Sequence, residues 1–380
     1  MELVSLIKCG NYDENRVLES VRAALKPFGG MQAFVRPGKV VLLKVSMLRG
    51  APPESAINTH PAVVRAVAHL VTKSGGRVVI GDSCAGVDHN CAESAMETSG
   101  YTKLAEDLGC ETVLFDDQKT STLAVRYGLY LDKFRIAEPM AEADVIINLP
   151  KLKTDVETLM TGAVKNMLGA LPSVDHPDIY RLAPTPYELG DALLDIYKAI
   201  MPTITIMDAI DAMEGNGPTR GRPVHLGAVL ASRDGVALDH VGAQLLGYNP
   251  AIIPTITSAL QRNIGENRSD YIDIVGDPVD DLVPDRLKKA GSALMINVPK
   301  RLLEVLSRRY FRVEPTWLAS KCAQSDLCIH SCPTSAISRV DGRNVIDSEK
   351  CIQCLYCYSL CPSGGIDLSK TFLARLFDRS

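Results

Sequence analysis

Seven of the eleven cysteines in the chain fall between residues 322 and 361, and their spacing suits metal chemistry. Four of them form the run Cys351-x2-Cys354-x2-Cys357-x3-Cys361, which Pro362 follows. Three thiolates at three-residue steps grip one iron–sulfur cluster from a tight loop, and a fourth thiolate from elsewhere completes the ligand set. Zinc knuckles instead pair two ligands across a gap. The run therefore favours a 4Fe-4S site over zinc.

A similar run precedes it but lacks one cysteine. It reads Cys322-x2-Ser325-x2-Cys328-x3-Cys332, so Ser325 stands at the second ligand position. The two runs together resemble the bacterial ferredoxin pattern, in which the fourth cysteine of each run serves the other cluster. The resemblance implies one complete 4Fe-4S site, formed by Cys332, Cys351, Cys354 and Cys357, and one incomplete site, formed by Cys322, Cys328 and Cys361.

The incomplete site leaves three outcomes open. Three thiolates can hold a 3Fe-4S cluster, or a labile 4Fe-4S cluster whose fourth iron takes water, Ser325 or Asp326 as an oxygen ligand. Oxygen is a harder donor than thiolate and binds that iron less tightly. The third outcome is an empty, vestigial site. Similar tails after each Cys-Pro pair, at 334–337 and 363–366, support a duplicated α+β ferredoxin-like fold.

The elements that position a partner site for these clusters lie in the first 280 or so residues. Short apolar runs alternate there with longer segments of helical period, which predicts an α/β fold with a parallel or mixed sheet covered by helices. We expect an α/β domain over 1–283, a basic connector over 284–315, the ferredoxin-like domain over 316–370 and a tail over 371–380. Strands are expected at 40–43, 77–80, 144–148 and 203–207, and helices at 13–26, 61–74, 101–109, 157–169 and 187–199.

Polar residues follow each of the four expected strands. Ligands of open α/β sheets bind outside the carboxyl ends of the strands, so these residues predict one crevice with lysines and carboxylates together. We expect Lys151, Lys153, Lys165 and Asp208 to face the same pocket. The alternative is a purely structural role, in which these residues cap helices or lie in solvent-exposed turns. The candidate catalytic residues are Asp208, Asp211, Glu214 and Lys165, and the candidate cofactor-binding residues are Lys44, Asp82, Lys151, Lys153, Asn166 and Asn216.

Four segments of the large domain resemble the family known as domain of unknown function 362, which often carries a ferredoxin-like tail. The segments are 145–154, 161–169, 208–218 and 231–239, and the resemblance covers about residues 36–300. This chain has Asp155 where the family usually has His, and Lys44-Val45-Ser46 where it usually has Lys-Pro-Asn. The resemblance implies the fold and the cluster content more than a reaction.

Charge and composition limit the classes of partner. The net charge is −4 and the pI is near 6.0, so nothing draws the whole chain to nucleic acid. No apolar run approaches the roughly 20 residues of a membrane span, and the start lacks the features of a signal peptide. We therefore expect a cytoplasmic protein with neither a nucleic-acid partner nor a membrane span.

Two functions remain. The first is an oxidoreductase that passes electrons from the clusters to an anionic substrate or cofactor in the crevice. Its lysines would bind the anion, and its carboxylates would bind a metal or move protons. The second is a non-catalytic electron-transfer or cluster-maturation protein whose large domain docks a partner. Either function requires an electron donor or acceptor protein.

Overall fold

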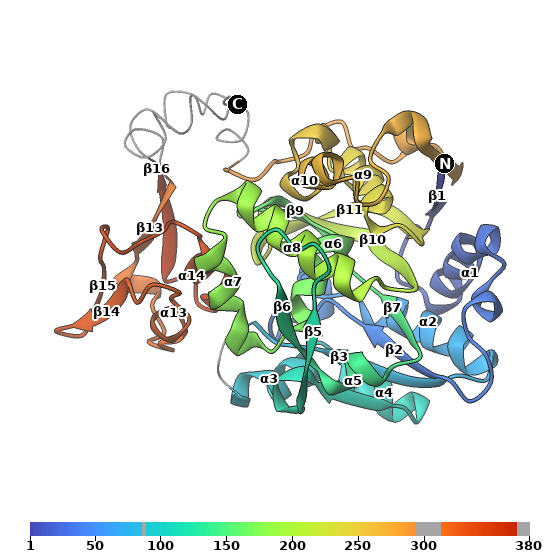
Figure 1. Ribbon diagram of the computed structural model, residues 1–380, viewed down its shortest axis with the longest axis horizontal. Helices are drawn as coiled ribbons and strands as arrows, with labels where there is room; N and C mark the ends of the chain where they lie inside the picture. The colour runs from blue at the N-terminus through green and yellow to red at the C-terminus, as the bar shows by residue number, and fades with distance from the viewer. Residues whose placement is uncertain (86–88, 293–312, 371–380) are drawn as a thin grey trace.

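The computed structural model describes residues 1–85, 89–292 and 313–370 (Figure 1). Most of the expected basic connector, at 293–312, and the tail at 371–380 lie outside the described residues. The strands are β1 (Glu2–Lys8), β2 (Val40–Lys44), β3 (Arg77–Asp82), β4 (Glu111–Leu114), β5 (Thr120–Ala124), β6 (Lys133–Ala137), β7 (Val145–Asn148), β8 (Lys151–Asp155), β9 (Leu159–Thr161), β10 (Ile204–Asn216), β11 (Arg220–Ser232), β12 (Ile272–Gly276), β13 (Val313–Trp317), β14 (Ile337–Val340), β15 (Arg343–Ile346) and β16 (Ile366–Lys370). The helices are α1 (Glu14–Leu25), α2 (Pro61–Lys73), α3 (His89–Thr98), α4 (Tyr101–Leu108), α5 (Glu138–Glu142), α6 (Ala163–Asn166), α7 (His176–Leu182), α8 (Pro186–Ile200), α9 (Gly235–Leu245), α10 (Pro254–Arg262), α13 (Leu327–His330) and α14 (Tyr356–Leu360).

A mixed sheet forms the centre of the large domain. Its strand order is β12-β1-β11-β10-β7-β2-β3-β4, with β8 pairing β10 and β9 pairing β8. Strands β10, β7, β2, β3 and β4 run parallel, whereas β11 is antiparallel to both β10 and β1. The predicted α/β class is confirmed. The parallel part brings the carboxyl ends of β2, β3 and β7 to one edge, where Lys44, Asp82 and Asn148 lie.

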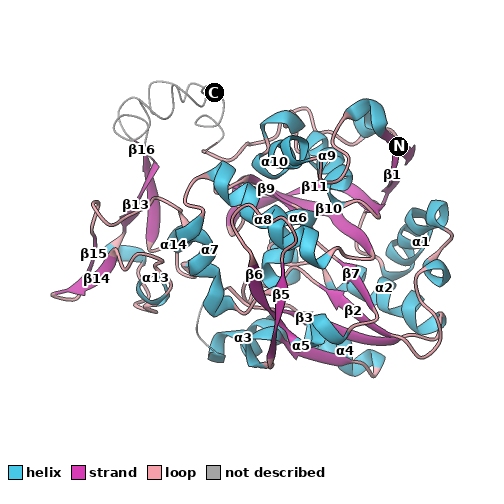
Figure 2. Cartoon of the chain, viewed as in Figure 1, coloured by secondary structure: helices cyan, strands magenta, loops and turns pink. Residues whose placement is uncertain are grey.

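Helices cover both faces of this sheet, as Figure 2 shows. The strands are apolar at nearly every position because alternate side chains pack on opposite sides. In β2, Val41 and Leu43 pack with α1, α2 and α4 in one buried cluster. Leu42, between them, packs in a second cluster with α6, α7 and α8. The sheet that presents the carboxyl edge is therefore packed between two layers of helices. In the described ranges, no helix combines the length and apolar character needed to cross a membrane.

Two expected elements differ from the structure. The helix expected over 157–169 is wrong, because 157–161 forms a turn and strand β9, and α6 begins only at Ala163. Asp155 causes the difference: its carboxylate accepts hydrogen bonds from the backbone N–H groups of Glu157 and Thr158, at 2.7 and 3.1 Å, and so fixes a turn. The residues from 208 to 216, expected to follow the end of a strand, instead continue as part of β10 in a long hairpin with β11.

The C-terminal module, residues 313–370, packs against the large domain beside α7 (Figure 1). It holds two antiparallel pairs, β13 with β16 and β14 with β15, and the short helices α13 and α14. Tyr356 and Leu360 of α14 belong to the same buried apolar cluster as residues of α6, α7 and α8. The rings of Tyr356 and Tyr180 stack at 4.4 Å between centroids. One apolar core therefore spans the module and the large domain.

Candidate functional site

A cavity of about 80 Å³ lies between the carboxyl edge of the sheet and the C-terminal module. The module contributes Tyr356 and Ser359 of α14 to its wall. Glu157, His176 and Tyr180 of the large domain complete the part of the wall nearest the module. Five of the residues singled out from the sequence line this cavity, namely Lys44, Asp82, Lys153, Lys165 and Asn166.

Lys44 and Asp82 form a buried ion pair at the ends of β2 and β3. The distance from Lys44 Nζ to Asp82 Oδ1 is 2.7 Å. Burial raises the pKa of Asp82 to about 7, against the opposing effect of the Lys44 charge. Gly169 lies against the pair, and a Cβ there would meet Asp82 Oδ1 at 2.3 Å. The cavity wall therefore requires glycine at this position.

Lys165 joins two carboxylates. Its Nζ lies 2.6 Å from Asp155 Oδ2 and 2.6 Å from Glu157 Oε2. Asp155 also accepts a hydrogen bond from the Thr161 hydroxyl at 2.5 Å. Glu157 accepts one from the Ser359 hydroxyl of the module at 2.6 Å. This network therefore ties the cavity wall to the module that carries the cysteines.

Lys153 differs from the other cavity lysines because it forms no ion pair among the described residues. Its Nζ donates to the Ile57 carbonyl at 2.7 Å and lies 3.5 Å from Ser46 Oγ. Burial lowers the pKa of Lys153 to about 7; the charge of Asp155 opposes this, while those of Lys165 and Lys151 add to it. An amine with these surroundings can both take up and release a proton near neutral pH.

The lowered pKa of Lys153 predicts a specific pH dependence of stability. Between pH 7 and 10 the unfolded chain holds a proton on this amine that the folded protein has lost. The free energy of unfolding therefore gains up to about 1.4 kcal/mol per pH unit from this group as the pH rises. Urea unfolding of the wild type and Lys153→Met at several pH values should show this gain only in the wild type. The same pH dependence of the free energy of unfolding in both proteins would contradict this prediction.

The other candidate residues lie outside this cavity. Lys151 Nζ pairs with Asp208 Oδ2 at 2.9 Å and donates to the Tyr12 hydroxyl at 2.6 Å, and the Tyr12 ring stacks on His60 at 3.6 Å. This group is fully partnered and does not line the cavity. The four side chains expected in one pocket are therefore divided, with Lys153 and Lys165 in the cavity and Lys151 and Asp208 beside it.

Three further candidates lie along the β10–β11 hairpin. Asp211 Oδ1 lies 2.7 Å from His225 Nδ1. Glu214 pairs with Arg222 and accepts a hydrogen bond from the backbone N–H of Lys288 at 2.7 Å. Asn216 accepts one from the backbone N–H of Gly291 at 2.8 Å. Glu214 and Asn216 thus anchor the segment that follows the large domain. None of the three lines the cavity.

The cysteines gather around two small cavities in the module. Cys332, Cys351, Cys354 and Cys357 line one of about 20 Å³. Cys322, Cys328 and Cys361 line the other, of about 10 Å³, together with Ser325 and Asp326. Among the described residues, no three His, Cys, Asp or Glu side chains are placed to hold a single metal ion. The thiolates surround a volume instead of a point, which suits a cluster.

The backbone around the two cavities repeats at a constant offset along the chain. Gln324 and Gln353, and likewise Asp326 and Leu355, have φ between 56° and 61°. The backbone N–H of Ala336 donates to Cys332 Sγ at 3.2 Å, and that of Gly365 donates to Cys361 Sγ at 3.1 Å. N–H donors to sulfur stabilise the thiolate form that iron requires. The residues present therefore fit iron–sulfur clusters, with Ser325 at the position equivalent to Cys354.

Sequence reasoning missed the cavity residues Glu157, His176, Tyr180, Tyr356 and Ser359. The sequence did contain a signal for Glu157, because the acidic residues Asp155 and Glu157 lie close in the chain to the basic residue Lys165. The aromatic and hydroxyl residues carry no such signal. They reach the cavity only because the module packs on the large domain, which no local pattern reveals.

The chain matches two described families. Residues 41–244 match the "Domain of unknown function (DUF362)", and residues 316–362 match a "4Fe-4S dicluster domain". Among curated proteins, the chain is 38% identical over 268 residues to the thylakoid-associated protein sll1697 of Synechocystis sp. (strain ATCC 27184 / PCC 6803 / Kazusa). This match covers 70% of this chain and 80% of that protein. The chain is 32% identical over 62 residues to an uncharacterized protein in the rpl9-rpl11 intergenic region of Porphyra purpurea, covering 14% of this chain and 83% of that protein.

Among solved structures, the lactate racemase apoprotein from Thermoanaerobacterium thermosaccharolyticum aligns with a TM-score of 0.40 and 11% identity, covering 65% of this chain and 57% of that one. The two family matches confirm the resemblance seen in the sequence. The chain belongs to the DUF362 family and is an iron–sulfur protein with a C-terminal 4Fe-4S dicluster domain.

Proposed function

We propose that this protein is an oxidoreductase whose cavity binds a small anionic molecule beside the complete 4Fe-4S site. One observation carries the proposal. Helix α14 holds the cluster ligand Cys357 and also supplies Tyr356 and Ser359 to the cavity wall. A ligand in the cavity thus lies against the helix that carries a cluster ligand. The cluster, when bound, supplies single electrons.

The cavity residues supply charge and protons. Lys44 is paired with Asp82, and Lys165 with Asp155 and Glu157, so neither of these lysines is free to pair with an anionic ligand. Lys153 has no such partner among the described residues and is the cation free to pair with an anion. Reduction of an organic molecule usually adds protons as well as electrons, and an amine that titrates near neutral pH is suited to deliver one.

The proposal predicts a small molecule that co-purifies with the protein and depends on Lys153. Wild-type protein should be purified without oxygen and denatured, and the released molecules identified by mass spectrometry. We expect a near-stoichiometric anion in the wild type and a clearly smaller amount in Lys153→Met, because the loss of one charge-assisted hydrogen bond costs at least about 1.4 kcal/mol, which is a tenfold loss of affinity. Lys39→Met removes an exposed lysine far from the cavity and serves as the matched control.

A different outcome would favour the alternative function. Ser325 is exposed at the incomplete cysteine site, so iron there lies close to solvent and to any docked protein. Wild-type protein that carries no small molecule but holds a stable protein partner would support a non-catalytic electron-transfer or cluster-maturation role. Equal ligand content in wild type and Lys153→Met would remove Lys153 from the proposed site.

A further inference from the structure

Two arginines of the large domain reach the loop that carries Cys361. Arg49 follows β2, and Arg220 begins β11. Arg49 Nη1 donates to the Pro362 carbonyl at 3.3 Å, and Arg220 Nη1 donates to the Ile366 carbonyl. Pro362 and Ile366 lie on either side of the turn whose N–H groups face the Cys361 sulfur. Both guanidinium groups therefore lie against one ligand loop of the incomplete site.

These arginines are half-buried and have no matching carboxylate. Neither arginine forms an ion pair among the described residues, and Arg49 Nε, Arg220 Nε and Arg220 Nη2 are buried there without a hydrogen-bond partner. Arg220 Cζ also lies 4.1 Å from the centroid of the Tyr358 ring. A cation that is partly removed from water without a counter-charge is unfavourable. An anion close to both side chains would offset that cost, and a cluster with its thiolates is negatively charged.

The complete site has different surroundings. Glu157, whose carboxylate is bonded to Lys165 and Ser359, lies near Cys354, and four thiolates surround that cavity instead of three. The incomplete site has one thiolate fewer and two arginines without a carboxylate partner among the described residues, while the carboxylate in its own wall, Asp326, is paired with Arg339. Net charge and local electrostatics set the potential of iron–sulfur clusters, and charges act strongly where water is excluded.

We propose that Arg49 and Arg220 raise the reduction potential of the cluster held by Cys322, Cys328 and Cys361 above that of the cluster at the complete site. A first electron from a one-electron donor, such as dithionite, then reduces the arginine-flanked cluster from its oxidised to its one-electron-reduced form. A second electron reduces the complete site. The inference rests on both sites being occupied and not on the identity of the cavity ligand.

Potentiometric titration of anaerobic protein, followed by electron paramagnetic resonance, tests this order. In the wild type, the signal of the incomplete site should change at the higher potential. In Arg49→Gln and in Arg220→Gln the ratio of reduced to oxidised cluster at that site, at a fixed potential, should fall about tenfold, which is a shift of about 59 mV for one electron. The midpoint of the complete site should stay within a much smaller range.

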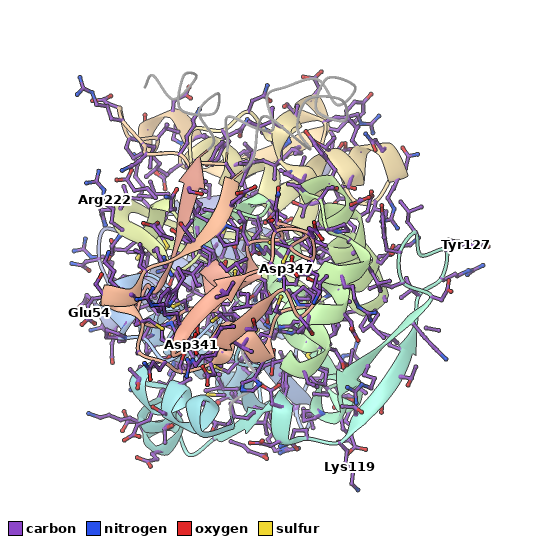
Figure 3. All side chains as sticks on the ribbon, turned by 90° about the vertical axis from the view of Figure 1, so that its left-hand side faces the viewer. Glu54, Lys119, Tyr127, Arg222, Asp341 and Asp347 are labelled. Atoms are coloured by element: carbon purple, nitrogen blue, oxygen red, sulfur yellow. The ribbon has the colours of Figure 1, made fainter. Side chains whose placement is uncertain are left out.

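Two control variants separate charge from structure. Arg222→Gln removes a guanidinium two positions along β11, which is exposed and paired with Glu214. Figure 3 looks onto the module, where Asp341 and Asp347 are labelled, and shows Arg222 at the margin of the view. The Arg222→Gln substitution should leave the midpoint potentials of both clusters unchanged. Arg220→Lys keeps the positive charge but loses the planar contact with Tyr358, and should keep most of the wild-type potential.

Several results would overturn the proposal. An unchanged midpoint in both glutamine variants with normal iron content would remove the arginines from any electrostatic role. So would an Arg220→Lys variant that shifts as far as Arg220→Gln. Wild-type protein in which the complete site is reduced first, or in which the incomplete site gives no signal, would also refute it. If Arg220→Gln loses iron, Arg49→Gln decides the question, because the Arg49 contacts are longer and the loop depends less on them.

Discussion

Replacing Ser325 by cysteine should make the incomplete site resistant to oxidation. In the wild type, seven cysteines in groups of four and three should bind between about seven and eight irons without oxygen. Mild oxidation should then remove about one iron and produce a 3Fe-4S electron paramagnetic resonance signal, because an oxygen donor holds the fourth iron weakly. Ser325→Cys restores the thiolate, so about eight irons should remain and the signal should be suppressed.

The geometry supports this design. Ser325 lies between Gln324 and Asp326, whose φ angles of 56° and 56° match those of 58° and 61° on either side of Cys354. A cysteine at 325 therefore inherits a backbone already shaped for a ligand. Asp326, the other oxygen donor nearby, is paired with Arg339. Iron and sulfide analysis before and after oxidation decides the matter. About four irons in anaerobic wild type would show the incomplete site to be vestigial, and a firmly held eight would show a strong fourth ligand.

Lys165→Met should be the most destabilising single substitution in the cavity. It leaves the buried carboxylates of Asp155 and Glu157 without their cation, and removal of one partner from a buried ion pair costs about 3–5 kcal/mol. The proximity of Lys165 holds the pKa of Asp155 below its usual range. Without the lysine that pKa should rise, so acidification from pH 7 to 5 should recover part of the loss.

Urea unfolding at pH 7 and pH 5 measures both effects. The double variant Lys165→Met with Asp155→Asn removes one uncompensated charge and should be more stable at pH 7 than Lys165→Met alone. Lys153→Met is the matched control, since it removes a lysine from the same cavity but leaves no ion pair broken among the described residues. A loss under about 1 kcal/mol in Lys165→Met would mean that the carboxylates are already protonated or reach water.

The sequence predicted those features that depend on local pattern. The four strands at 40–43, 77–80, 144–148 and 203–207 all exist, because a buried parallel strand is a short apolar run that the chain itself displays. The cysteine runs were likewise predictable, because the spacing of the cysteines is visible in the sequence itself. The helix expected over 157–169 failed, because Leu159 adopts a φ of 65° in a turn set by Asp155. The periodicity of apolar residues cannot reveal a turn that a side chain fixes by accepting hydrogen bonds from nearby backbone N–H groups.

The candidate site was harder to predict because charge pairing is a tertiary property. Lys151 and Lys153 look alike in the sequence, two positions apart on one strand. Only the fold shows that Asp208 neutralises Lys151, while no carboxylate among the described residues reaches Lys153. Arg49 and Arg220 likewise gave no signal, since their meeting with the Cys361 loop depends on how the module docks.

The shared apolar core has a consequence for how the protein responds to iron. Tyr356 and Leu360 pack with the helices of the large domain, yet they sit on the helix that also carries Cys357. Metal binding to a site that exists only in the folded state is itself folding free energy. We therefore expect cluster binding by the module to stabilise the large domain as well, through the packing of Tyr356 and Leu360. Loss of the cluster should then lower the free energy of unfolding of both parts of the chain together.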